Sequence, residues 1–147
     1  KAGIPYEIIN SEAYDGKQAF ETALYNCLTR YKVQMICLAG FMRILSADFV
    51  GKWSGRIINI HPSLLPAYKG LNTHTRVLAN GEAETGCSVH YVDTGIDTGE
   101  IIAQKTVPVS LDDDANTLEQ RVCAAEHDLY PAILADIAQE LLREQAG

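Results

Sequence analysis

Residues 55–66 read GRIINIHPSLLP, and this stretch decides how we expect the chain to fold. The isoleucine run at its centre is typical of a buried strand, because β-branched side chains pack well on a sheet that is covered on both faces. Asn59 and His61 interrupt the run two positions apart, so their side chains lie on one face of the strand. Pro62 then stops the hydrogen-bond ladder. The pattern predicts a buried strand that ends in two polar side chains.

The chemistry of this polar pair has two interpretations. In an α/β sheet, ligands bind at the carboxyl ends of the strands. An amide beside an imidazole at such an end could stabilise an oxyanion and move a proton. Alternatively, Asn59 caps a turn and His61 is a core histidine with its hydrogen bonds satisfied. The stretch by itself leaves both interpretations open.

The composition indicates one soluble globular domain, since 47% of the 147 residues are hydrophobic and 21% are charged. A net charge of −7 argues against a nucleic-acid partner. No apolar run approaches the roughly 20 residues of a membrane span, and no signal peptide is visible. Four scattered cysteines within apolar patterns favour reduced thiols over disulfides or a metal site. We therefore expect a cytoplasmic protein that binds neither nucleic acid nor membrane, and no metal.

Strand and helix patterns alternate on both sides of the central stretch. We expect strands over residues 6–9 and 33–39, the second in the centre of the sheet, and a helix capped by Ser46 through about Trp53. A strand, a helix and the Asn59 strand form a right-handed βαβ unit. That topology places the loop at residues 40–45 beside Asn59.

The second half of the chain predicts a hairpin and a helical end. Strands over 86–92 and 101–109 flank a wide glycine-containing loop, and the first of them alternates between two different surroundings. Asp97 lies in that loop, and an aspartate beside glycine in a turn usually only stabilises the turn through hydrogen bonds to the nearby backbone. If it met His61, its carboxylate would orient the ring and favour the protonated form. A helix begins after residues 112–114, and Pro131 is expected to divide it in two.

Five motifs, in this order, resemble the phosphoribosylglycinamide formyltransferase family. They are LAGFMRIL at 38–45, INIHPSLLP at 58–66, YKG at 68–70, GCSVHYVDTGIDTGEIIAQ at 86–104 and EHDLYP at 126–131. The resemblance implies a Rossmann-like α/β fold, with a mostly parallel twisted sheet flanked by helices and residues 1–147 forming a single catalytic domain. It also implies transfer of a formyl group from the co-substrate 10-formyltetrahydrofolate to the amine of glycinamide ribonucleotide, in de novo purine biosynthesis, without a metal.

The resemblance also implies roles for particular residues. By position, the catalytic trio is Asn59, His61 and Asp97. The folate-binding residues are Lys17, Met42, Arg43, Ile44, Leu45, Asp93, Thr94, Gly95 and Ile96, with Lys17 standing where relatives often have arginine. The substrate-binding residues are Pro62, Ser88, His90 and Glu126. A helix-surface charge at Glu126 and structural hydrogen bonds at Ser88 and His90 are the alternatives.

The chain departs from the family at its beginning. The family starts with a strand and a glycine-rich loop that cradles the substrate phosphate at a helix N-terminus, and no such loop occurs here. We therefore expect a fragment in which the first strand-helix units are missing. The rival functions are formyltetrahydrofolate deformylase, methionyl-tRNA formyltransferase, and a folate-binding fragment without turnover. The expected oligomeric state is monomer or homodimer.

Overall fold

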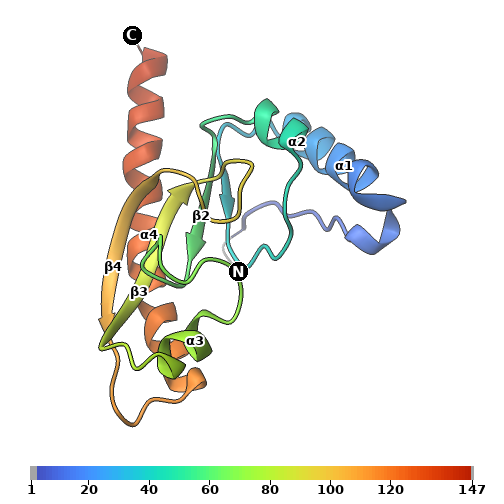
Figure 1. The fold of residues 1–147 in the computed structure, drawn as a ribbon. Helices are drawn as coiled ribbons and strands as arrows, with labels where there is room; N and C mark the ends of the chain where they lie inside the picture. Colours follow the sequence, from blue (N-terminus) through green and yellow to red (C-terminus); the bar gives the residue numbers. More distant parts are fainter. Residues whose placement is uncertain (1–2, 147) are drawn as a thin grey trace.

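The computed structural model describes residues 3–146, which form a four-stranded sheet flanked by helices (Figure 1). The strands, in their order across the sheet, are β1 (Ile36–Leu38), β2 (Ile57–His61), β3 (Glu84–Tyr91) and β4 (Ile101–Pro108). The helices are η1 (Ser11–Ala13), α1 (Gly16–Arg30), α2 (Ala47–Lys52), α3 (Thr73–Ala79) and α4 (Ala115–Ala146). The expected α/β architecture is confirmed.

The strand directions are mixed. β1 and β2 are parallel and joined through α2, whose N-cap Ser46 accepts a hydrogen bond from the backbone N–H of Phe49, as predicted. β2 and β3 pair antiparallel. β3 and β4 form the expected antiparallel hairpin. The described sheet therefore has one parallel and two antiparallel pairings, where a mostly parallel sheet was expected.

The two faces of the sheet have opposite character. α4 covers one face, on which Ile58, Val89 and Ile137 form part of a buried apolar cluster. Asn59 pairs with His90, and both side chains lie on the opposite face, since side chains alternate along each strand. The apolar packing on α4 thus fixes the strands that carry the polar residues.

Two predicted strands differ from the structure. Residues 6–9 form no strand, and Tyr6 and Ile8 are exposed, because none of the described strands lies beside them to complete a ladder. The strand expected over 33–39 is only Ile36–Leu38, and it lies at the edge of the sheet because β2 alone pairs with it.

One further expectation is corrected. Pro131 lies inside a continuous α4, where its ring costs one backbone hydrogen bond but the helix packs on the sheet both before and after it. β3 is buried on both faces from residues 85 to 90, and its two faces have the different surroundings that its alternation predicts: Val89 lies in the apolar cluster on α4, and His90 lies on the polar face. In the described part of the chain, no helix has the length and apolarity that a membrane span requires.

Candidate active site

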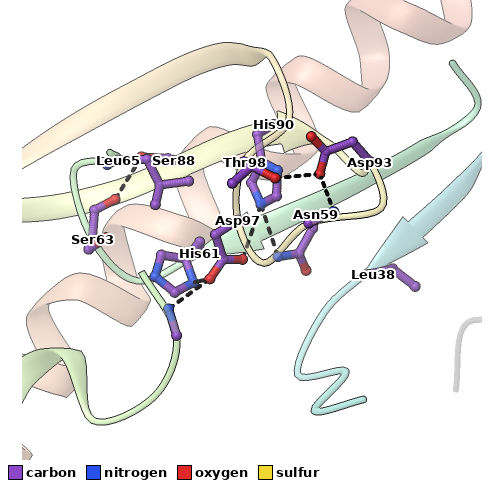
Figure 2. Close-up of polar contacts among 12 residues, drawn as sticks. Leu38, Asn59, His61, Ser63, Leu65, Ser88, His90, Asp93, Asp97 and Thr98 are labelled. Carbon is purple, nitrogen blue, oxygen red and sulfur yellow. Dashed lines mark hydrogen bonds and ion pairs between the residues drawn. The ribbon is translucent and has the colours of Figure 1, made fainter. Parts of the chain in front are cut away.

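Asp97 reaches the polar face of the sheet from the loop between β3 and β4 (Figure 2). The loop can turn back tightly because residue 99 is glycine, where a Cβ atom would lie 1.8 Å from the carbonyl oxygen of Tyr91. Asp97 has φ of 49°, a left-handed conformation that aspartate tolerates better than most residues. Its Oδ2 lies 3.4 Å from Nδ1 of His61 and accepts a hydrogen bond from the backbone N–H of Gly70 at 2.9 Å.

His61 has an oxygen acceptor near each ring nitrogen. Its Nε2 lies 3.0 Å from the carbonyl oxygen of Tyr68, which can only accept, so Nε2 carries a proton. Its Nδ1 can donate toward Asp97 only when the ring is doubly protonated. His61 is 6% exposed, so both contacts are shielded from water. The two oxygen atoms fix the orientation of the ring at the end of β2.

His90 orients the amide of Asn59. The Nδ1 of His90 lies 2.8 Å from the carbonyl oxygen of Tyr91 and must donate to it, so in the neutral ring Nε2 is an acceptor. That Nε2 lies 3.2 Å from Nδ2 of Asn59. One N–H of the amide is thereby held, and the other is available to a ligand. The Oδ1 atom of Asp97 lies 3.6 Å from the same Nε2, beyond hydrogen-bond length.

These side chains lie on a cavity of about 1080 Å³. Most of the predicted site residues line it: Met42, Arg43, Ile44, Leu45, Asn59, His61, Pro62, His90, Asp93, Gly95, Ile96, Asp97 and Glu126. Three predicted residues do not: Lys17, Thr94 and Ser88. The Lys17 ammonium lies 4.0 Å from Glu21, and Ser88 is fully buried, with its hydroxyl donating to the carbonyl oxygen of Ser63 at 2.6 Å.

The two walls of the cavity differ in chemistry. The loop after β1 exposes Met42 and Ile44, which are 78% and 58% exposed, and Ile96 faces the same space from the hairpin loop. Exposed apolar side chains gathered around a cavity favour a ligand with an apolar part. The α4 wall carries carboxyl groups, and burial raises the pKa of Glu126 there.

Sequence reasoning missed several residues of the α4 wall and one of α3. They are His74, Glu119, Cys123, His127 and Tyr130. The α4 members recur at three- and four-residue spacing together with Glu126, and that periodicity was available as a signal. His74 has a buried Nδ1 without a hydrogen-bond partner in the structure, and burial lowers the pKa of its ring. Within residues 3–146, no three His, Cys, Asp or Glu side chains are grouped to hold a metal ion.

Comparison with known proteins gives consistent matches over most of the chain. Formyl transferase is the family that matches residues 1–134. The bovine trifunctional purine biosynthetic protein adenosine-3 is 48% identical over 143 residues, which are 97% of this chain and 14% of that protein. The chain therefore spans only a small part of that relative.

Two solved structures share the fold. The phosphoribosylglycinamide formyltransferase of Brucella melitensis is 47% identical with a TM-score of 0.87, covering 93% of this chain and 70% of that one. The Coxiella burnetii phosphoribosylglycinamide formyltransferase, solved in complex with CHES, is 49% identical with a TM-score of 0.85. The match covers 90% of this chain and 63% of that one. The chain therefore belongs to the formyl transferase family and is similar over most of its length to the phosphoribosylglycinamide formyltransferases.

Proposed function

We propose that this chain carries the site that transfers a formyl group from 10-formyltetrahydrofolate to the primary amine of glycinamide ribonucleotide, a step of de novo purine biosynthesis. The observation that carries the proposal is the meeting of Asn59, His61 and Asp97 on one cavity of a formyl transferase fold. Residues 1–147 act in it as a single catalytic domain.

Asn59 and His61 supply the stabilisation of the transition state. The attacking amine converts the formyl carbon into a tetrahedral centre, and negative charge develops on the formyl oxygen. The free N–H of Asn59 donates to that oxygen, and His61, on the same face of β2, stabilises it as a cation or as a hydrogen-bond donor. The contacts with Asp97 and Tyr68 hold its ring in place.

Asp97 fixes His61 and handles the proton. Its carboxylate is held by the N–H of Gly70, so it keeps its place as the charge on the reacting atoms changes. An ordered water at the carboxylate can take the proton released by the amine and pass it to folate N10. Both substrates are small molecules held together, so their positioning supplies much of the rate enhancement.

The two walls of the cavity divide the substrates between them. The apolar loop at residues 42–45 and the hairpin loop at 93–96 suit the flat pterin ring. Glu126 and Pro62 lie where the acceptor would approach the trio, and Glu126 can accept hydrogen bonds from its hydroxyl or amine groups. Lys17, whose ammonium lies 4.0 Å from Glu21, would attract the carboxylate tail of the folate.

We place the protein in the cytoplasm, as a monomer or homodimer that binds these small molecules and neither nucleic acid nor membrane. The four cysteines are all unpaired, which suits a reducing compartment. The net charge of −7 disfavours a polyanionic partner.

Three parallel incubations test the function. The protein is mixed with 10-formyltetrahydrofolate and either glycinamide ribonucleotide, buffer alone, or charged initiator tRNA, and the formylated product is identified by mass spectrometry. Formylation of the ribonucleotide alone is the expected result. Formate release in buffer would instead indicate a deformylase, and formylated tRNA would indicate a methionyl-tRNA formyltransferase. Either outcome overturns the proposal.

A further inference from the structure

α4 presents a thiol and an imidazole to the cavity one turn apart, and formyl transfer uses neither. The Sγ atom of Cys123 lies 3.6 Å from Nε2 of His127. Both residues line the cavity, with Cys123 half-buried and His127 exposed. A neutral imidazole in this position can take the proton of the thiol, and the thiolate is the nucleophilic form of cysteine.

The other three cysteines lack this arrangement. Cys87 is fully buried, and burial raises the pKa of its thiol to about 11. Burial also raises the pKa of Cys37. The Cys27 thiol donates a hydrogen bond to the carboxylate of Glu7, a group whose pKa is lowered chiefly by its hydrogen bond with Arg30. Cys37 is the exposed one of the four, but the Cys123 thiol has an imidazole nitrogen 3.6 Å away, and this pairing singles it out.

We propose that Cys123 is a thiol modification site at which a low-molecular-weight disulfide, such as glutathione disulfide, forms a mixed disulfide with the protein. His127 Nε2 accepts the thiol proton, and the Sγ thiolate attacks one sulfur of the disulfide. A new S–S bond forms as the old one breaks, and the departing thiolate takes up a proton. No oxidant other than the disulfide is consumed.

The modification would occupy the α4 end of the cavity. Cys123 precedes Glu126 by three residues on α4, and both line the same space. A tripeptide attached there fills the region that the formyl acceptor, glycinamide ribonucleotide, needs, and this consequence rests on the proposed function. The reaction of the thiol with a disulfide does not depend on the proposed function.

Thiol titration of the whole chain, without substrates, tests the site. With 5,5′-dithiobis(2-nitrobenzoate) at neutral pH, we expect one thiol to react at least about tenfold faster than the rest. Cys123→Ser should remove this fast phase, His127→Gln should slow it several-fold, and the control Cys27→Ser should leave it intact.

Peptide mapping of the unsubstituted protein after brief exposure to glutathione disulfide makes the test independent of how the variants fold. The expected mixed disulfide is on the peptide that contains Cys123. A fast phase that survives in Cys123→Ser, an unchanged rate in His127→Gln, the absence of any fast thiol, or glutathione on another cysteine would each overturn the proposal. None of these results depends on formyl transfer.

Discussion

Asp97 can lose its charge while keeping its shape. In Asp97→Asn, an amide oxygen can still accept the N–H of Gly70, but His61 loses the carboxylate that lies beside its Nδ1. We expect the rate of formyl transfer to fall by about 10³-fold while the free energy of unfolding changes little. Steady-state kinetics and urea titration measure the two effects. A variant within tenfold of the unsubstituted rate would contradict the role given to this carboxylate.

Ser88 serves the fold beneath the site. Its hydroxyl donates to the carbonyl oxygen of Ser63 and accepts from the N–H of Leu65 at 3.0 Å and from the amide of Gln104 at 2.8 Å. We expect Ser88→Ala to lower the free energy of unfolding by about 1–3 kcal/mol, because the buried carbonyl of Ser63 and the buried N–H of Leu65 lose the hydroxyl as hydrogen-bond partner. Urea denaturation provides the measurement, with the exposed Ser54→Ala as a control that should change it by under about 0.5 kcal/mol.

Part of the site was predictable residue by residue. The two-residue period of a strand was enough to place Asn59 and His61 on one face. The pairing of Asn59 with His90 was not predictable, since it depends on the register between β2 and β3. The hydrogen bond from Gly70 to Asp97 joins residues 27 apart in the chain, and no local pattern encodes it.

At the scale of elements, Glu21 joins α1 to α2. Its buried carboxylate accepts from the backbone N–H of Ser46 at 2.7 Å and from the Ser46 hydroxyl. Ser46 directly follows the loop at residues 41–45. We expect Glu21→Ala to loosen that loop and raise the dissociation constant for folate about tenfold, since a charged hydrogen bond is worth about 1.5–3 kcal/mol.

Calorimetric titration with a folate analogue measures this effect. Glu21→Gln is the matched variant, because its amide oxygen can still accept one hydrogen bond, and it should bind more tightly than Glu21→Ala. Equal affinities of Glu21→Ala and the unsubstituted protein for the folate analogue would show that the hydrogen bonds between Glu21 and Ser46 do not position the loop.

Elements encoded by local patterns were predicted well. Ser46 marks the start of α2 through a cap that involves only its own first turn. Residues 6–9 have a strand-like pattern and form no strand, since a strand also needs a neighbour. Pro131 carries a strong local signal to stop a helix, but the tertiary packing of α4 outweighs it.

For the whole molecule, acid stability depends on the ion pair that anchors the start of α4. Arg121 donates to Asp113 and is the main reason why the pKa of this carboxyl falls from 3.8 to about 2. Because the folded state lowers this pKa, the pair stabilises the protein fully above about pH 4, and the stabilisation is lost as the pH falls toward about 2.

Asp113→Asn should therefore lower the urea midpoint most above about pH 4, and the difference from the unsubstituted protein should vanish near pH 2. Urea titrations across this range provide the measurement. Asp112→Asn makes the same change of charge outside the ion pair and is the control. A gap of constant size between the unsubstituted protein and Asp113→Asn at every pH would refute the linkage.

The arrangement of the whole molecule explains how polar side chains can gather on one face of the sheet without disturbing its core. α4 supports one face of the sheet with an apolar core, which leaves the opposite face free for a histidine, an amide and a carboxylate. The first half of the same helix, from Ala115 to Pro131, also contributes residues to the cavity wall. One element thus serves both the stability of the sheet and the cavity.

Single-turnover formyl transfer to glycinamide ribonucleotide by the unsubstituted protein and Asn59→Ala tests the central claim most directly. We predict equal dissociation constants for the formyl donor and a rate that falls by about 10²–10³-fold in the variant, because only the transition state needs the amide N–H. Equal rates in the two proteins would contradict the account.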